Sequence, residues 1–378
     1  MMKMKLIFYL RHYPPFGTPL VGGTATAVDG LVKGLGRLHQ DVTILCEGDS
    51  ASNYTTSDGI RIISFRRNTS RNPFSISPDL KQFLSAGSEK PDIIILNGCF
   101  NPALFTVARI ACAAGIPYVA ASHTHYHPAL FNRRPYLKWP YWHLIEKRFL
   151  ARAKAVQVYD MGHTEYLKGL GLKTIYLAVP NGFFPENAPA SMNHRPQKKG
   201  PVRIVFRGRL DAYHKGLDLL FRAIAQLRSD HAMQVFIQGP DLGDKVRLVK
   251  LAQQLSISSN VTFVEPDYSP PYSFLVQQDV FVLTSRFEGF GIAALEAMLA
   301  GLVVLATDSA GIAPYVQRSG CGVLVKADGG SIAAGLRHLI SMRDDWSEMG
   351  RKGRQYVMEH LTWTQIADKA LNDYRQLS

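Results

Sequence analysis

The sequence predicts an α/β protein built from two doubly wound domains, each around a parallel sheet. Short apolar runs alternate with helical patterns along both halves of the chain, as they do when helices cover a buried parallel sheet. The alternation breaks once, between residues 180 and 201, where prolines, glycines and lysines replace it. The length of 378 residues leaves room for about two to three domains.

The first half supplies five apolar runs that predict strands. A helix with apolar residues at i, i+3, i+4 and i+7 follows Gly22-Gly23 and extends over residues 28–38, although three glycines within it argue against a fully regular helix. The first run follows two lysines as in a signal peptide, but it is too short for one, and we expect a buried strand. The predicted strands are Lys5–Leu10, Val42–Cys46, Asp92–Leu96, Tyr118–Ala121 and Ala155–Tyr159.

The second half repeats this organisation after the break. Because ligands of open α/β sheets collect at the carboxyl ends of the strands, two such domains that face each other predict a central cleft supplied from both sides. The predicted strands are Val202–Phe206, Gln234–Gln238, Asn260–Val264, Val280–Thr284 and Leu302–Ala306. The predicted helices are Gly216–Leu227, Asp244–Leu255 and Gly291–Ala300.

The charge balance favours anionic partners. Against 30 Asp and Glu the chain has 43 Lys and Arg, a formal net charge of +13, which suits nucleic acid, a phospholipid surface or phosphorylated small molecules. Residues 1–190 carry +9 of it and residues 191–378 carry +4. No recognition helix, RNP-like motif or zinc finger is evident, so we do not expect nucleic acid to be the partner.

The cysteines and the apolar stretches predict a cytoplasmic protein. Four scattered cysteines without a C-x-x-C motif fit neither a disulfide framework nor a zinc knuckle, which favours a reducing compartment. The longest apolar stretches, residues 104–122 and 291–307, are interrupted by charged residues or proline, so no membrane span is predicted. Membrane contact would then be peripheral, at the inner face.

The segment from Glu288 to Met298 is the most informative motif. It follows a predicted strand and opens a predicted helix, where Gly289 and Gly291 allow a ligand to approach the backbone and the helix start offers free amides to a phosphate. Glu288 and Glu296 would lie on the order of 10 Å apart. A nucleoside diphosphate sugar suits this arrangement, with sugar hydroxyls on one carboxylate and ribose hydroxyls on the other. The alternative is an idle loop residue and an ordinary helix residue, although Glu296 lies among apolar neighbours.

A second motif, residues 208–218, follows the strand Val202–Phe206. It places Arg209 and Lys215 on a loop between strand and helix, where cations can neutralise the charge of a departing diphosphate, although such a loop can also simply be solvated. Gly22 and Gly23 follow the first strand in the same way and could approach the same phosphates.

Together these segments resemble family 4 glycosyltransferases of the GT-B fold. The likeness spans essentially the whole chain and includes Pro180-Asn181-Gly182, the Gly-Gly pair near the start and the two motifs above, in the right order. It implies transfer of a sugar from a nucleotide donor with retention of anomeric configuration, without a metal or another cofactor. It also implies an acceptor-binding domain over residues 1–185, a nucleotide-sugar-binding domain over 186–360, and a final helix over 361–378, with Trp363 at its start, that crosses back to the first domain.

The resemblance also assigns roles to single residues. Arg209 and Lys215 would bind the donor diphosphate, Glu288 the sugar ring and Glu296 the ribose. Val264 matches a position near the base. His123 matches a histidine that faces the reacting sugar. Backbone amides of the donor loop would bind sugar and phosphate, at Phe290, Gly291 and Ile292.

The chain departs from the family pattern at two places. Residues 310–314 read Ala-Gly-Ile-Ala-Pro where the family usually has Gly-Gly-x-Pro-Glu, and Glu265 replaces a glycine common before the base pocket. These departures leave the donor open between UDP- and GDP-sugars, and the acceptor open between a glycan, a lipid and a lipid-linked molecule.

The alternate histidines His123, His125 and His127 raise the question of a metal site, since alternate residues of an extended segment point to one side. No carboxylate ligands are evident nearby, and the chain has no D-x-D motif to hold a metal against a nucleotide sugar. We therefore expect no metal and interpret His123 as a polar residue of the cleft, with a hydrogen-bonded structural histidine as the alternative.

The segment from Arg133 to Lys154 is strongly basic and rich in aromatic residues. Seven Lys and Arg accompany a single acid, Glu146, and Trp and Tyr residues lie between them. This composition suits a surface that holds anionic headgroups and inserts rings at the bilayer boundary. The alternative is a solvated helix whose aromatic residues belong to the core.

Other functions remain open at this point. A nucleotide-sugar epimerase or a phosphorylase could share the architecture, and a two-lobed sugar-binding protein would close on a ligand without turnover. The paired glutamates together with Arg209 and Lys215 exceed what binding alone requires. For a glycosyltransferase, loss of Arg209 or Lys215 is expected to abolish most transfer and leave the fold intact, and Glu288→Gln to lower the rate.

Overall fold

The computed structural model describes residues 3–15, 18, 22–86, 90–124, 126–189, 199–267 and 272–377. Contacts within the chain divide it into two compact units, one formed by Met1–Phe184 with Leu361–Ser378 and the other by Pro185–His360. Part of the predicted break, residues 190–198, lies outside the described residues.

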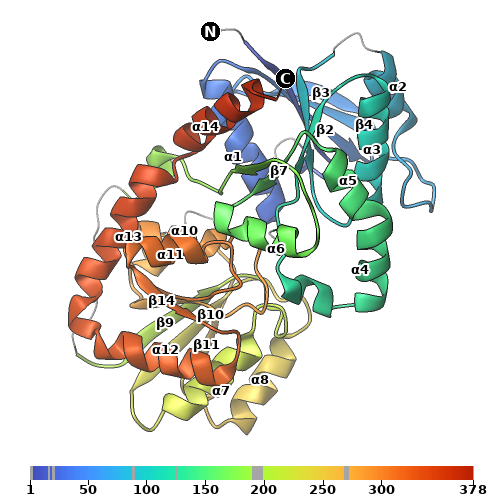
Figure 1. Cartoon of the computed structure of the whole chain (residues 1–378). Helices are drawn as coiled ribbons and strands as arrows, with labels where there is room; N and C mark the ends of the chain where they lie inside the picture. Colours follow the sequence, from blue (N-terminus) through green and yellow to red (C-terminus); the bar gives the residue numbers. More distant parts are fainter. Residues whose placement is uncertain are drawn as a thin grey trace. The chain divides into compact units, whose positions relative to one another are not determined.

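The first unit is an α/β structure around an eight-stranded sheet (Figure 1). Its strand order is β3-β4-β2-β1-β5-β6-β7-β8, and the strands are parallel except for the β3–β4 pair. The strands are β1 (Lys5–Leu10), β2 (Asp41–Gly48), β3 (Ser52–Thr55), β4 (Arg61–Arg66), β5 (Ile93–Asn97), β6 (Tyr118–Ala121), β7 (Ala155–Val158) and β8 (Tyr176–Ala178). The α-helices are α1 (Gly23–Arg37), α2 (Pro78–Ala86), α3 (Pro102–Ala113), α4 (Pro135–Tyr141), α5 (Lys147–Arg152), α6 (Thr164–Gly169) and α14 (Trp363–Arg375).

Helix α1 is continuous despite its glycines, two of which form the surface on which α14 packs. A Cβ on Gly30 would lie 2.1 Å from the Trp363 ring, and one on Gly34 would lie 2.7 Å from the Trp363 carbonyl oxygen. Figure 1 shows α14, in red, beside α1, in blue. The glycines thus serve helix packing and do not interrupt the helix.

The second unit contains a six-stranded parallel sheet in the order β11-β10-β9-β12-β13-β14. The strands are β9 (Val202–Arg207), β10 (Met233–Gln238), β11 (Val261–Val264), β12 (Val280–Leu283), β13 (Val303–Thr307) and β14 (Gly322–Val325). The helices are α7 (Leu217–Leu227), α8 (Lys245–Gln254), α9 (Tyr272–Leu275), α10 (Ile292–Ala300), α11 (Ala313–Ser319), α12 (Gly329–Ser341) and α13 (Trp346–His360).

Both sheets are buried between helices, as the continuous apolar runs predict. All residues of β5 and of β12 are buried, which is typical of parallel strands covered on both faces. The strands and helices predicted in the sequence are present, and most of their ends differ by one or two residues. The described part of the chain contains four strands that the sequence did not predict, β3, β4, β8 and β14.

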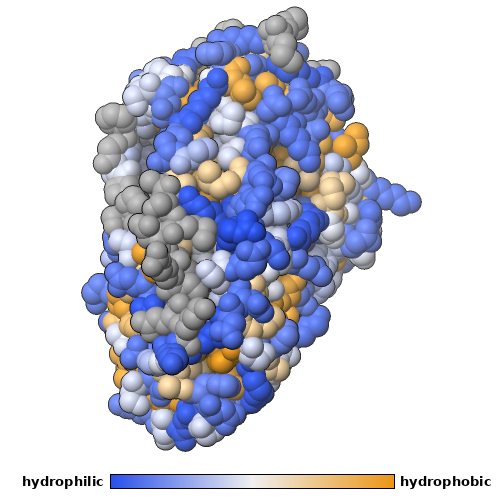
Figure 2. Space-filling model, turned by 90° about the vertical axis from the view of Figure 1, so that its left-hand side faces the viewer, coloured by the Kyte–Doolittle hydropathy of each residue, from blue (hydrophilic) through white to orange (hydrophobic). Residues whose placement is uncertain are grey.

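The surface and the cysteines are those of an ordinary globular protein. Figure 2 shows a face that is mostly hydrophilic, on which hydrophobic residues occur singly or in small groups. The four cysteines, all within the described residues, are free. Among the helices of the described ranges, none is both long and apolar enough to cross a bilayer.

Candidate functional site

The second unit brings two predicted residues into contact where its strand order reverses. Strands β9 and β12 are neighbours in the sheet. After β9 the next strand, β10, is added on one side of this pair, and after β12 the next strand, β13, is added on the other. The loop after β9 carries Lys215, and the loop after β12 carries Glu288. Their side chains form an ion pair and are only 12% and 15% exposed. Ligands of open α/β sheets bind at such a switch point, so the pair lies where a ligand is expected.

The environment of the pair keeps Glu288 ionised. Burial acts to raise the pKa of Glu288, but the charge of Lys215 and hydrogen bonds from Lys215 and Ser285 hold this pKa below its ordinary value. The Ser285 hydroxyl donates to the Glu288 carboxylate at 3.1 Å. Glu288 is therefore an acceptor with a fixed orientation, suited to hydroxyl groups of a ligand.

Arg209 lies on the same loop as Lys215, but its side chain is exposed. Both cations act on His214, whose pKa is lowered by burial and then by the charges of Lys215 and Arg209. Positive charge thus accumulates around His214, a residue that the sequence interpretation did not single out. Glu288 and Asp211 oppose this charge in part, and the exposed Arg209 guanidinium is the cation that could meet the negative charge of a diphosphate.

Glu296 lies on the least buried face of α10, with its side chain 24% exposed, and has its own cation. Arg207, the last residue of β9, forms an ion pair with Glu296 and donates to the carbonyl oxygen of Asp267 at 2.9 Å. Burial raises the pKa of Glu296, and Arg207 opposes that rise. The sequence interpretation missed Arg207, although a charged residue directly after the predicted strand Val202–Phe206 could have indicated a site residue.

The start of α10 has the geometry that the glycines predicted. Gly291 caps the helix with φ +98°, a left-handed conformation, and a Cβ there would lie 2.8 Å from Leu283 Cδ2. Ile292 is the first helical residue, and the bonds of the helix begin with the Ala294 and Leu295 amides, which donate to the Gly291 carbonyl, so the amides of Ile292 and Ala293 have no partner within the helix. The Phe290 side chain is buried against Tyr315, so its backbone is the part that could meet a ligand. Val264 is half-buried at the end of the edge strand β11.

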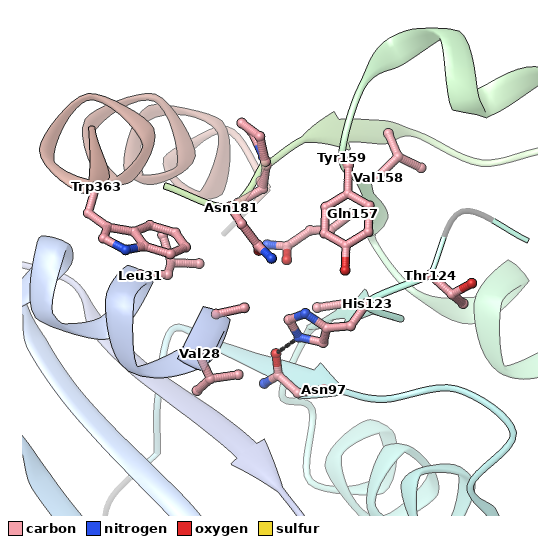
Figure 3. Close-up of a pocket in the computed structure, with 14 residues that line it drawn as sticks. Val28, Leu31, Asn97, His123, Thr124, Gln157, Val158, Tyr159, Asn181 and Trp363 are labelled. Atoms are coloured by element: carbon pink, nitrogen blue, oxygen red, sulfur yellow. Dashed lines mark hydrogen bonds between the residues drawn. The ribbon is translucent and has the colours of Figure 1, made fainter. Parts of the chain in front are cut away.

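The first unit contains a pocket at the carboxyl ends of β5, β6, β7 and β8 (Figure 3). His123, Gln157 and Asn181 come from the ends of these strands, and Val28 of α1 and Trp363 of α14 close the pocket. Figure 3 shows Gln157 and Asn181 across from His123.

His123 is held in a defined orientation in this pocket. Its backbone is left-handed, with φ +51°, and its Nε2 lies 2.8 Å from Asn97 Oδ1. Burial lowers the pKa of His123 to about 4, so the imidazole is neutral at physiological pH. Asn97, which ends β5, is a site residue that the sequence interpretation missed. Gly22 caps α1 with φ +104°, followed by Gly23, and a Cβ on Gly22 would meet nothing within 4 Å.

The structure describes only two of the three histidines of the cluster, His123 and His127. His125 lies outside the described residues, and among the residues described no group of three or more His, Cys, Asp or Glu could hold a metal ion. The His127 ring instead packs edge-on against Tyr166.

Glu146 connects the two segments that directly follow Asn97 and His123. It ends the π-helical turn Trp142–Glu146 and is 2% exposed. One carboxylate oxygen accepts hydrogen bonds from the Tyr126 hydroxyl at 2.6 Å and from the Phe100 amide at 3.0 Å. Phe100 and Tyr126 each lie three residues beyond one member of the Asn97–His123 pair, and both have left-handed backbones. Glu146 therefore stabilises the backbone of the two segments that position Asn97 and His123 in the pocket.

Glu146→Gln is expected to gain stability relative to the wild type as the pH rises. Burial raises the pKa of Glu146 from 4.5 to about 7, so between these values the unfolded chain loses a proton that the folded chain keeps, and wild-type stability falls. A glutamine has no such loss and can still accept both hydrogen bonds. Thermal unfolding at pH 4.5 and pH 8 should show a relative gain on the order of 3 kcal/mol at the higher pH.

Three neighbours of Glu146 do not change their protonation between pH 4.5 and pH 8, so they do not affect the difference between the two proteins. Burial and the Glu146 carboxylate both raise the pKa of Tyr126, Tyr141 and Cys99, so these groups stay neutral throughout this pH range. A difference between the two proteins that is the same at both pH values would contradict the assignment.

Comparison with known families identifies the chain. Residues 188–356 match the family described as glycosyl transferases group 1, and residues 22–182 match the glycosyl transferase 4-like domain. The chain belongs to the group 1 (GT4) glycosyltransferases. It is accordingly an enzyme that transfers a sugar from a nucleotide-sugar donor.

Several curated relatives support this assignment. A glycosyltransferase of Methanocaldococcus jannaschii is 25% identical to this glycosyltransferase, over 98% of both chains. The D-inositol 3-phosphate glycosyltransferase of Nocardia farcinica is 33% identical over 46% of this chain and 40% of its own length. A GDP-mannose-dependent phosphatidylinositol monomannoside mannosyltransferase of Mycobacterium tuberculosis is 34% identical over 41% of this chain and 43% of its own. With the last two, less than half of either chain is aligned.

Solved structures show that this glycosyltransferase has the GT-B fold. Sucrose-phosphate synthase from Thermosynechococcus elongatus has a TM-score of 0.81 at 20% identity and covers 99% of both chains. Anabaena HepE, in complex with UDP and glucose, has a TM-score of 0.72 at 16% identity, over 99% of this chain and 100% of that one.

The predicted site residues of this glycosyltransferase fall into two groups. Gly22, Gly23 and His123 belong to the first unit, and the donor-loop residues belong to the second. Within the second unit the structure joins Lys215 to Glu288, whereas Glu296 pairs with Arg207.

Proposed function

We propose that this glycosyltransferase is a retaining, metal-independent enzyme that moves a sugar from a UDP- or GDP-sugar to a glycan, a lipid or a lipid-linked acceptor. The observation that carries the proposal is the Lys215–Glu288 pair at the switch point of the second sheet, beside Arg209 and the start of α10. Residues 186–360 would bind the donor, residues 1–185 the acceptor, and the helix over 361–378 would belong with the acceptor domain.

Each group of the donor loop has a role suited to its chemistry. Arg209, Lys215 and the first amides of α10 would stabilise the diphosphate as the bond to the sugar breaks, which takes the place of a metal ion. Glu288 would accept hydrogen bonds from the sugar. Glu296, held by Arg207, would accept them from the ribose. Val264 would lie near the base.

His123 would act from the acceptor side as a neutral imidazole. Its hydrogen bond to Asn97 leaves the other ring nitrogen for a hydroxyl of the sugar or of the acceptor. Gly22 and Gly23 would let the backbone approach the same phosphates. The names of two relatives give inositol 3-phosphate and phosphatidylinositol monomannoside glycosyl transfer, the latter with GDP-mannose, which supports testing GDP-sugars and lipid acceptors first.

Nucleotide binding is the direct test of the donor assignment. A ligand that binds only the folded state stabilises it by about 2.7 kcal/mol at a concentration of 100 Kd. Thermal unfolding with UDP, GDP and ADP, without added metal and with EDTA, should show a shift for UDP or GDP. No shift with any of the three, or one that EDTA removes, would contradict the proposal. The anomeric configuration of the product, read by NMR, tests retention.

We also propose peripheral contact with an anionic membrane through residues 133–154. Five of its seven basic residues are exposed, and so are several apolar ones, whereas its single acid, Glu146, is buried. The aromatic residues divide: Tyr136 and Trp139 are 71% and 41% exposed, whereas Trp142 and Phe149 belong to the core. The exposed set has the composition of an interfacial surface.

Binding to phosphatidylglycerol vesicles is expected to depend on this charge. Each basic residue near an anionic surface contributes about 1 kcal/mol, so Arg148→Gln with Arg152→Gln should weaken binding by about 30-fold, and salt should weaken it further. The matched control removes two exposed charges from α8, Arg247→Gln with Lys250→Gln, and should have little effect. Equal losses in both double variants would contradict the assigned surface. Vesicle sedimentation measures the binding, and transfer to a lipid acceptor should follow it.

A further inference from the structure

A groove in the first unit lies beside α4, on the segment proposed to face the membrane. Its walls are largely aromatic rings and prolines: Tyr126, Pro128, Phe131, Pro135, Trp139 and Tyr166. Its cavity volume is about 680 Å³. This lies within the range of clefts that hold small-molecule ligands, roughly 300–1,000 Å³.

Two of the polar side chains that line the groove have partners within the protein. The Tyr126 hydroxyl donates to the buried Glu146, and Glu165 pairs with Lys168 at 2.7 Å. The Trp139 ring stacks on Phe131, with centroids 4.5 Å apart. Because Tyr126 and Phe131 are almost fully buried, the surface that the groove offers a ligand comes chiefly from Trp139, Tyr166 and the prolines, which suits a hydrocarbon chain.

The rim of the groove carries positive charge and exposed apolar side chains. Asn132 and Pro135 both line the groove, and the two residues between them, Arg133 and Arg134, are exposed. Tyr136, Leu137 and Leu144, on α4 and the turn after it, are 71%, 55% and 59% exposed. An apolar groove with a basic rim is complementary to an amphiphile that has a hydrocarbon chain and an anionic head.

We propose that this groove holds one hydrocarbon chain of an anionic phospholipid, with the phosphate at Arg133 and Arg134. The inference rests on the membrane contact proposed above and adds to it a binding site for a single lipid. The site would fix the acceptor-side unit to the bilayer through a buried chain as well as through surface charge. Such anchoring by two signals is what stable peripheral binding requires.

The dependence of binding affinity on the length of an alkyl chain tests directly whether the groove holds hydrocarbon. Each methylene moved from water into an apolar site contributes about 0.8 kcal/mol, which corresponds to about a fourfold gain in affinity. Alkyl phosphates from butyl to decyl, kept below their micellar concentrations, should therefore bind with a stepwise increase in affinity. Inorganic phosphate should bind weakly, because it can use the rim alone.

Gly169 offers a way to fill the groove without disturbing the fold. It lines the groove at the end of α6, and a Cβ there would meet nothing within 4 Å. Gly169→Leu is expected to remove the dependence on chain length. The matched control is Gly330→Leu, at an exposed helical glycine of the second unit whose nearest atom to an added Cβ lies at 3.5 Å. It should bind alkyl phosphates as the wild type does.

The rim is tested separately from the groove. Arg133→Gln with Arg134→Gln should weaken binding of every alkyl phosphate by the same factor, about 30-fold for two charges, and leave the dependence on chain length unchanged. Isothermal titration calorimetry of the full chain gives these affinities. A flat chain-length profile in the wild type, or an equally steep one in Gly169→Leu, would overturn the proposal.

Phosphatidylglycerol vesicles separate this inference from the one on which it rests. Wild-type protein that binds the vesicles but shows no chain-length dependence overturns the groove and leaves the membrane contact standing. Protein that shows the chain-length dependence but fails to bind the vesicles overturns the membrane contact, and with it the phospholipid as occupant. The expected result is binding by the wild type and Gly330→Leu, with binding by Gly169→Leu at least tenfold weaker.

Discussion

Replacing Lys215 by alanine is expected to lower the rate of sugar transfer by about 100- to 1,000-fold and to destabilise the protein as well. Loss of one preorganised group that stabilises a departing anion costs about 3 to 4 kcal/mol. The same change leaves the Glu288 carboxylate nearly buried without its cation, which costs about 3 kcal/mol of folding stability. The sequence alone predicted that the fold would stay intact in Lys215→Ala. Because of the ion pair, we now expect this variant to lose stability as well as activity.

Arg209→Ala separates the two effects. The Arg209 side chain is exposed, so its removal should change stability by less than about 0.5 kcal/mol while transfer falls as far as in Lys215→Ala. Values of kcat/KM and urea unfolding of both variants provide the measurement. Near-normal turnover in both would contradict the donor site.

A double variant controls for the buried charge. Glu288→Gln in the Lys215→Ala background replaces the unpaired carboxylate by a neutral amide, which still accepts the Ser285 hydroxyl. Stability is expected to recover most of its loss, whereas activity stays low. A stability loss that persisted in the double variant would show that the unpaired Glu288 carboxylate is not its cause.

The central strands could be predicted from the sequence because they are buried on both faces. Each residue of β5 and β12 must be apolar or satisfied internally, which leaves a continuous run. Three of the missed strands, β3, β8 and β14, lie at the edges of their sheets, and β4 lies next to an edge. The sequence of β3, Ser-Asn-Tyr-Thr, is polar and resembles a loop, whereas β8 and β14 are apolar but only three and four residues long, so their sequences give little signal.

The site could be predicted where local sequence decides the geometry. The glycine cap of α10 and the cationic loop after β9 follow from their positions between strand and helix. Pairings through space could not be predicted in this way. Arg207 meets Glu296 across 89 positions of the chain, and Glu146 meets Phe100 across 46. Such contacts depend on the packing of elements, which no local pattern encodes.

Gly216→Ala is expected to disrupt the donor loop far more than its backbone conformation alone would require. Gly216 has φ +64°, and an added Cβ would lie 2.0 Å from the carbonyl oxygen of Thr284. The loops cannot separate freely, because the Thr284 hydroxyl donates to the Lys215 carbonyl at 3.1 Å and the Arg286 amide donates to the His214 carbonyl at 3.0 Å. A methyl group must break these bonds or distort the loop that carries Lys215.

Gly320→Ala is the matched control for this change. Its φ of +65° is nearly the same, but an added Cβ would meet nothing within 4 Å, so it should cost only the left-handed conformation, about 1 to 2 kcal/mol, and leave transfer unchanged. Gly216→Ala should cost at least about 2 kcal/mol more in urea unfolding and lower both donor affinity and kcat, because Lys215 loses its position beside Glu288. Equal stability losses in the two variants would show that the loops yield to the methyl group. The contact that excludes a side chain at Gly216 also fixes the loop that presents Lys215. An unchanged donor affinity in Gly216→Ala would therefore show that the position of Lys215 does not matter for donor binding.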